Sequence, residues 1–168
     1  MIEIRLPTDL YAHIVEDLQK PHEFALERVG FVFGKFDELT SDKSVVLLHQ
    51  YTAVADDDYI ENDNYAAAIN SESIVKAMQV VRVKRAEPGC VFHIHTHEHK
   101  GRPSFSRQDQ QGLPPLIPGF LRSAPKGVHG LILLSHNNGI AQVWRPTAPD
   151  RPESSSIVLT GKYMRVWS

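Results

Sequence analysis

The sequence predicts a single α+β domain spanning residues 1–168, in which helices flank a mixed β-sheet. Apolar and β-branched runs typical of strands are interspersed with helix-like patterns, but there is no regular strand–helix–strand repeat. The chain is long enough for one domain with its own core, and its 42% hydrophobic and 23% charged residues are usual for a globular protein. A mixed sheet is therefore expected, not a parallel α/β fold.

A strand and a helix are predicted at the start of the chain. Residues 1–6 alternate enough in polarity for an edge strand, and Thr8-Asp9 offers a cap for the helix that follows. Pro21 ends this helix. Its apolar face is formed by residues at the i, i+4 and i+8 positions, namely Leu10, Ile14 and Leu18.

Two strands joined by a polar loop over residues 36–43 come next. Residues 29–33 form a continuous apolar run, and Gly30 and Gly34 stand where a close approach of another backbone requires glycine. Residues 44–52 are rich in β-branched and aromatic side chains, which favours a second strand.

An acidic loop and a second helix follow. Residues 55–64 carry several carboxylates but lack the glycine at position six and the closing glutamate of a calcium loop, so a solvated loop is expected. Asn70 is placed to cap the helix, and Pro88-Gly89 ends it. The apolar face of this helix contains Ile74, Ala77, Met78 and Val81.

The second half of the chain is predicted to consist mainly of strands. Residues 90–96 form an apolar strand, and Ser106 begins a short helix, after which prolines and glycines up to Gly127 indicate an ordered loop. The remaining predicted elements are a buried strand over 129–135, a two-residue hairpin turn at Asn138-Gly139, a strand over 140–144, a loop over 145–156, and a last strand or strand pair over 157–167 interrupted at Gly161.

Charge and targeting patterns exclude several classes of function. The net charge is −2 and no basic run is longer than residues 81–85, so nucleic acid is not an expected partner. There is no 18-residue apolar run and no signal-peptide pattern, so we expect a cytoplasmic protein that does not contact a membrane. The single cysteine, Cys90, excludes an internal disulfide. It is expected to be an inert strand residue, with a nucleophilic role as the alternative.

The histidine-rich stretch from Phe92 to Asp109 is the strongest functional pattern. Side chains alternate between the faces of a strand, so His95 and His97 point the same way and can share one ion. Ser106-x-x-Asp109 is a helix-start pattern that brings a carboxylate back towards the end of that strand. Two imidazoles and one carboxylate are a three-ligand zinc set, which leaves a fourth position for water as in catalytic sites.

Hydrolysis at such a site requires two further groups. A zinc-bound water has a pKa of about 7, so it supplies hydroxide at neutral pH. A general base must take the water proton and pass it to the leaving amine, and Glu27, just before the strand over 29–33, is the candidate. Taken alone, a glutamate at such a junction is usually solvated or caps a helix. Ser106 is the candidate donor to the developing oxyanion.

Together these residues resemble the JAMM motif of the MPN-domain metalloproteases. The matching elements are Glu27 before the strand with Gly30 and Gly34, then His95-Thr-His97, then Ser106-Arg-Gln-Asp109. The strand and hairpin from Val128 onward resemble the family's next strands, so most of the chain is covered. There are two departures. Eight residues separate His97 from Ser106, one more than the common spacer, and Glu98-His99 replaces the proline that often follows the second histidine.

The resemblance implies an MPN-like (cytidine-deaminase-like) fold and a compact, bacterial-type family member. It implies one Zn²⁺ per chain held by His95, His97 and Asp109, with Glu27 as general acid/base and Ser106 polarising the scissile carbonyl. The implied activity is that of a zinc metallopeptidase or isopeptidase, which hydrolyses the bond after the C-terminal glycine of ubiquitin or a ubiquitin-like protein, in deconjugation or precursor processing. The activating and conjugating enzymes of the same pathway would be further partners.

Alternatives stay open for the function and for the ligands. The chain could instead be a peptidase that removes a small amino-acid adduct from a sulfur-carrier protein, or a non-catalytic MPN-type scaffold. His93 has the same strand parity as His95, so His93-x-His95 is a second ligand register. His99 falls after the strand and is expected to be solvated or to orient a neighbour.

Overall fold

The structure is a computed structural model that describes residues 1–21, 27–40, 42–60, 67–82 and 89–168. In this part of the chain the elements follow in the order β1 (Ile2–Pro7), α1 (Thr8–Leu18), β2 (Val29–Glu38), β3 (Ser44–Ala53), η1 (Asp56–Asp58), α2 (Ser71–Arg82), β4 (Gly89–Thr96), α3 (Arg107–Gly112), η2 (Pro114–Leu116), α4 (Ile117–Ser123), β5 (His129–Leu134), β6 (Gly139–Arg145), β7 (Ala148–Thr160) and β8 (Arg165–Trp167).

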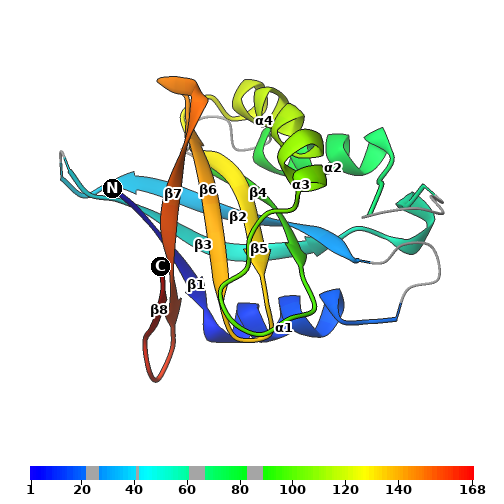
Figure 1. Cartoon of the computed structure of the whole chain (residues 1–168). Helices are drawn as coiled ribbons and strands as arrows, with labels where there is room; N and C mark the ends of the chain where they lie inside the picture. Colours follow the sequence, from blue (N-terminus) through cyan, green and yellow to red (C-terminus); the bar gives the residue numbers. More distant parts are fainter. Residues whose placement is uncertain (22–26, 41, 61–66, 83–88) are drawn as a thin grey trace.

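Strands β1 to β7 form a closed barrel (Figure 1). Neighbouring strands pair in the order β1, β3, β2, β4, β5, β6, β7, and β7 pairs again with β1, which closes the sheet. The pairs β1–β3, β1–β7 and β4–β5 are parallel and the other pairs in the barrel are antiparallel, so the sheet is mixed as expected. β8 adds to β7 as an antiparallel partner.

The expected MPN-like α+β fold, with helices flanking a sheet, is therefore wrong. β1 was expected at the edge of the sheet, but Ile4 lies opposite Val46 of β3 on one side and Ile157 of β7 on the other. This double pairing closes the sheet, so its inner face is filled by side chains of its own strands. It joins the two ends of the chain, and local apolar patterns do not encode such a contact.

Buried apolar side chains form one cluster on each face of the barrel wall. The inner cluster takes residues from every barrel strand and also from α1, which contributes Ile14 and Leu18. In Figure 1, α1 lies across the lower end of the barrel. The outer cluster lies between the wall and the short helices α2 and α4, with Phe31, Leu131 and Phe120 among its members. The wall around β4 is therefore packed on both sides, which holds that strand in place.

Several local predictions are confirmed. A Cβ on Gly34 would stand 2.6 Å from the backbone oxygen of Leu47, so the predicted close approach of backbone is confirmed there, whereas a Cβ on Gly30 would meet the side-chain ring of Tyr51. Asn70 caps α2, because its Oδ1 accepts from the backbone N–H of Ser73 at 3.0 Å. The cap expected at the start of α1 is wrong: Pro7 occupies the N-cap, and no side chain accepts a hydrogen bond there.

Other local predictions are wrong because tertiary pairing extends or shifts the elements. β2 continues to Glu38, into the expected polar loop, and α4 forms inside the expected loop before Gly127, with Pro118 in its first turn where proline is tolerated. The turn of the β5–β6 hairpin lies before the expected Asn138-Gly139 pair. The backbone N–H of Ser135 donates to the Asn138 oxygen, so the turn is closed between these two residues.

Residues 148–160 form the long strand β7 instead of the expected loop over 145–156. The prolines that suggested a loop, Pro149 and Pro152, lie where the β6–β7 pairing shifts register, so neither has a Cα partner in the ladder.

The acidic loop is partly described. η1 carries Asp56, which pairs with Arg28 at 2.7 Å, and Asp58, which pairs with Lys76 at 3.0 Å, so these carboxylates meet cations as well as solvent. The rest of that loop, from Glu61 onward, and the expected helix end at Pro88 lie outside the described residues. No helix in the described ranges combines the length and the apolar character that a membrane span requires.

Candidate metal centre

The ends of β2 and β4 bring the first three candidate residues together. Phe92 and Ile94 point into the inner cluster, so the alternating residues His95 and His97 lie on the outer face of the wall. β2 and β4 are antiparallel, with Val29 opposite His95. Glu27, two residues before Val29, therefore comes alongside His97, and the distance between Glu27 Oε1 and His97 Nε2 is 3.6 Å.

The start of α3 positions the fourth candidate residue. Ser106 is the N-cap, and its Oγ accepts from the backbone N–H of Asp109 at 3.1 Å, while Asp109 Oδ2 accepts from the backbone N–H of Ser106 at 2.7 Å. This reciprocal capping box fixes the carboxylate of Asp109. The segment between β4 and α3 runs from near α1 back along the barrel to α3 (Figure 1).

Asp109 faces both histidines. Its Oδ1 lies 3.3 Å from His95 Nε2, and its Oδ2 lies 3.4 Å from His97 Nε2. The ligand atoms of Glu27, His95 and His97 all lie within 4.8 Å of one another. Glu27, His95 and His97 form the group that can hold a metal ion, and Asp109, which is not in that group, lies beside both histidines. We call these four residues the metal-binding cluster.

The hydrogen bonding of His95 fits such an ion. Both of its ring nitrogens are buried and neither makes a hydrogen bond within the described ranges; Nε2 has only the ion-pair contact with Asp109 Oδ1 at 3.3 Å. Buried polar atoms are rarely left without a partner, and a metal ion at Nε2 would provide one. Imidazole nitrogens with a carboxylate oxygen are a donor set that suits zinc and other transition metals.

The electrostatics favour the protonation states that metal binding requires at His97 and Asp109. Burial lowers the pKa of the His97 imidazole, and neighbouring His95 lowers it further. Burial alone would raise the pKa of Asp109, but the adjacent His95 and the hydrogen bonds with Ser106 outweigh it and hold this pKa well below its usual range. Burial raises the pKa of the Glu27 carboxyl. At neutral pH His97 is therefore neutral and Asp109 is ionised.

The other candidates lie outside the cluster. His93 is 3% exposed and packs its ring against Phe31 at 5.8 Å between centroids, and the group of possible ligands includes His95 and His97 but not His93. Burial is the main cause that lowers the pKa of His93 to about 3, so it is neutral. His99 is exposed, as expected. Cys90 is buried in the inner cluster, and burial raises its pKa to about 12, which disfavours a thiolate nucleophile.

Two cavities flank the cluster, and the sequence alone indicated neither. The first, which we call the apolar cavity, has a volume of about 350 Å³, and Glu27, His93 and Asp109 form part of its lining. The second, which we call the polar cavity, has a volume of about 320 Å³ and is lined in part by His97 and Glu98. Their walls come from segments far apart in the chain. The sequence indicated only that His93, which lines the apolar cavity, lies on the same strand face as His95.

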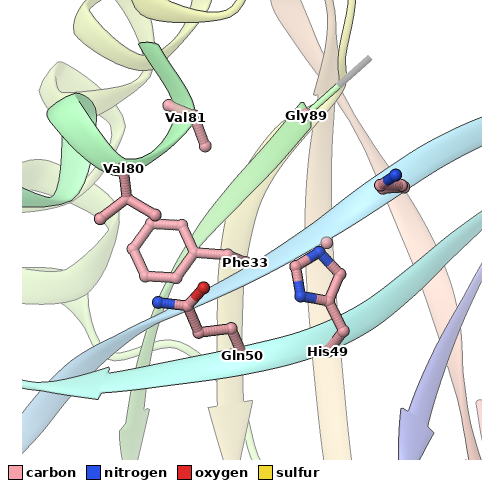
Figure 2. A pocket seen from close by; sticks show the side chains of 8 residues that line it. Phe33, His49, Gln50, Val80, Val81 and Gly89 are labelled. Carbon is pink, nitrogen blue, oxygen red and sulfur yellow. The ribbon is translucent and has the colours of Figure 1, made fainter. Parts of the chain in front are cut away.

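A smaller cavity of about 50 Å³ lies between α2 and strands β2 and β3 (Figure 2). Its lining includes Phe33, His49, Gln50, Val80, Val81 and Gly89. Gly89 is the first residue of β4, whereas His95 is close to the end of the same strand, about 20 Å further along at 3.3 Å per residue. No cluster residue lines this cavity, so it is separate from the candidate metal centre.

No family model and no curated protein matches the sequence. Among solved structures, the chain is similar over 81% of its length to the STIL N-terminal domain of Trichoplax adhaerens, with 7% sequence identity and a TM-score of 0.29. The chain spans 37% of the length of that structure. A similarity of this level supports no inference about fold or function.

Proposed function

We propose that this chain is a zinc-dependent hydrolase that cleaves the peptide or isopeptide bond after the C-terminal glycine of a ubiquitin or ubiquitin-like protein. The observation that supports it most strongly is the position of Glu27, which approaches the two histidines from the segment just before β2. The side chains of His97 and Glu27 are 20% and 25% exposed, so solvent reaches this side of the cluster. Closed structural zinc sites have no such open position.

His95, His97 and Asp109 would hold the ion. Asp109 Oδ2 accepts from a backbone N–H in the capping box, while its Oδ1 points at His95, so the helix start orients the carboxylate for binding. A zinc ion bound there supplies a water of lowered pKa and polarises the scissile carbonyl. The ligands come from β4 and α3, so folding brings them together before the ion binds.

Glu27 would act as general acid and base. Its Oε1 lies next to His97 Nε2, within reach of a water that occupies the open side of the cluster. It takes one proton from that water as the oxygen adds to the glycine carbonyl carbon. The C–N bond then breaks as Glu27 delivers this proton to the leaving nitrogen. The hydroxyl oxygen stays on the glycine, and its remaining proton passes to the released amine, which leaves a carboxylate and an ammonium group.

Ser106 would stabilise the charge that develops on the carbonyl oxygen. A hydroxyl carries one hydrogen to donate and two acceptor positions. Ser106 Oγ accepts the backbone N–H of Asp109, and the Ser106 side chain is also a hydrogen-bond partner of the Asp109 carboxylate, so a substrate oxygen would take the hydroxyl hydrogen in place of that carboxylate. Such a donor typically contributes about 10²-fold to 10³-fold in rate.

The substrate class is supported by the motif alone. Glu27, His95, His97, Ser106 and Asp109 are the residue types of the JAMM motif in the family's order. The resemblance lies in these residues and not in the architecture, because the chain is a closed barrel. A ubiquitin-like protein whose tail ends in glycine is therefore the partner to test first.

Replacing Glu27 with glutamine tests this mechanism. Glu27→Gln keeps the size and polarity of the side chain but removes the proton acceptor, so we expect cleavage of ubiquitin-like fusions to fall by at least about 10²-fold. The zinc content should stay at about one ion per chain, because the two histidines and Asp109 remain. The measurements are turnover of the fusions by gel assay and metal content by elemental analysis.

Lys43→Gln is a matched control, because Lys43 is exposed, directly precedes β3 and does not belong to the metal-binding cluster. It should leave both turnover and zinc content unchanged. Full activity of Glu27→Gln with zinc retained would exclude the proposed role of Glu27.

A further inference from the structure

The apolar cavity beside the metal-binding cluster has a lining that selects a particular kind of ligand. Apolar side chains from four segments form most of its wall, namely Val29, Ala67, Ile69, Ile74, Leu113 and Leu116. Its volume of about 350 Å³ is at the low end of the range for small-molecule sites, about 300–1,000 Å³. The cavity therefore fits one apolar residue or a group of that size.

The polar groups of the same cavity are suited to an amine. Glu27 and Asp109 contribute carboxylates, and no lysine or arginine is among the described residues that line it. His93 also lines the cavity, and its buried Nδ1 has no hydrogen-bond partner in the part of the chain that the structure describes. An amine with an apolar body meets this environment better than an anion does.

The position of Glu27 indicates which product enters the cavity. Glu27 lines the apolar cavity, whereas the polar cavity is lined by His97 and not by Glu27. Glu27 is the group that delivers a proton to the leaving amine in the proposed reaction. The leaving amine therefore forms on the side of the apolar cavity, and the glycine tail extends towards the polar cavity.

We propose that the apolar cavity binds the side chain of the residue that leaves as the amine, and that it selects leucine-like or phenylalanine-like residues over glycine and aspartate. The inference rests on the proposed function, because it assigns the leaving side of that reaction. The apolar cavity would therefore favour a small apolar amino acid, or a peptide that begins with one, as the group released from the glycine tail.

The end of α3 offers a variant that fills the cavity without disturbing the core. Gly112 lines the cavity, and a Cβ built on it meets no atom within 4 Å. Among the described glycines only Gly101 has a positive φ. The backbone at Gly112 therefore has a conformation that other residues can adopt. Gly112→Trp therefore places a large ring at the cavity. Gln111→Trp is the matched control, because Gln111 is its exposed neighbour on the same helix and is not among the lining residues.

Peptide cleavage provides the first readout. Internally quenched peptides carry Gly-Gly followed by leucine, phenylalanine, glycine or aspartate, and the zinc-loaded proteins are compared by kcat/KM. Wild-type protein and Gln111→Trp should cleave the leucine and phenylalanine peptides at least about tenfold better than the glycine and aspartate peptides. Gly112→Trp should lose this difference.

Direct binding provides a second readout that does not depend on catalysis. Leucinamide, phenylalaninamide and glycinamide share the same metal-chelating amine and amide, so differences among them report on the side chain. Calorimetric titration should show at least about tenfold tighter binding of the first two than of glycinamide by wild type and Gln111→Trp, but not by Gly112→Trp.

The two readouts separate the inference from the proposed function. Side-chain-dependent binding without cleavage of any peptide or of the ubiquitin-like fusions would reject the proposed function and support the cavity as an apolar amine site. Cleavage without side-chain preference, together with equal binding of the three amides, would overturn the inference and support the proposed function. Equal binding of the amides without cleavage would overturn both.

Discussion

Asp109 combines two roles at the scale of single residues. One of its carboxylate oxygens accepts the backbone N–H of Ser106 in the capping box, and both oxygens face the histidines at 3.3 and 3.4 Å. The same interactions that begin α3 therefore orient a possible metal ligand. This explains why a helix-start pattern in the sequence was informative about the site.

Ser106 is linked to this arrangement, and its replacement separates capping from catalysis. Ser106→Ala removes the acceptor for the Asp109 N–H, so we expect a loss of about 1 kcal/mol in the free energy of unfolding. It also removes the proposed donor to the carbonyl oxygen, so hydrolysis should fall about 10²-fold or more. The measurements are denaturant unfolding and turnover of the same fusions.

Ser106→Thr keeps a hydroxyl and a capping oxygen, so it should retain most of both properties. A destabilised Ser106→Ala variant with unchanged turnover would limit Ser106 to the capping role.

At this scale the sequence was a good guide for the cluster and a poor one for its surroundings. Strand parity placed His95 and His97 on one face, and the structure brings Glu27 and Asp109 to them. The functional roles of these residues remain predictions. The apolar cavity was not predictable, because residues such as Ile74 and Leu113 look like ordinary core residues until the fold brings them beside His93.

At the scale of elements, His129 joins three parts of the barrel wall. It is the first residue of β5 and is fully buried, with 0% exposure. Its Nδ1 accepts from the backbone N–H of Val91 in β4 at 3.1 Å, and its Nε2 contacts the oxygen of Ala124, just after α4, at 2.9 Å. These contacts assign the tautomer with hydrogen on Nε2. A neutral imidazole is required, because Nδ1 must remain an acceptor.

This requirement makes the stability of the fold depend on pH. Burial outweighs the two backbone hydrogen bonds and lowers the pKa of His129 from 6.5 to about 4. Below about pH 6.5 the unfolded chain binds a proton at this residue that the folded chain does not bind, so the free energy of unfolding falls between about pH 6.5 and pH 4. The contribution of His129 to this fall is roughly 3 kcal/mol.

His129→Gln tests the assignment, since glutamine can accept and donate at this place but does not titrate. Urea unfolding at pH 7 and pH 4 should show a weaker pH dependence for the variant than for wild type, by roughly 3 kcal/mol. The same pH dependence in both proteins would mean that His129 is not the titrating group.

Elements defined by local patterns were predictable, and elements defined by pairing were not. α1, β4 and β5 carry clear periodicity or apolar runs, and they appear close to their expected bounds. β7 was missed because Pro149 and Pro152 suggest a loop, although both stand where the pairing with β6 shifts register. Most of its first half is exposed, so no apolar alternation marked it as a strand.

At the scale of the whole molecule, the closure of the barrel is what the sequence did not encode locally. The parallel pairing of β1 with β7 joins residues 3–7 to residues 156–160 across almost the full length of the chain. The individual strands carry ordinary apolar patterns that suit an open sheet equally well. Several correct strands within an incorrect architecture are the expected result when long-range pairing decides the fold.

The metal-binding cluster depends on this architecture, because its residues come from the segment before β2, the end of β4 and the start of α3. An ion bound there connects parts of the chain that are distant in sequence. Binding to the folded state alone stabilises it by mass action, by about 2.7 kcal/mol when free zinc is 100 times its Kd. Removal of the metal should therefore lower the thermal stability as well as stop hydrolysis.

Zinc titration of the chelator-treated protein tests the central claim most directly. Calorimetry should show binding of about one zinc ion per chain to wild type, with a rise in Tm, and neither effect in a His95→Ala, His97→Ala double variant that remains folded by circular dichroism. Failure of the wild-type protein to bind zinc, or equal binding by the double variant, would contradict the assignment of this cluster as the metal centre.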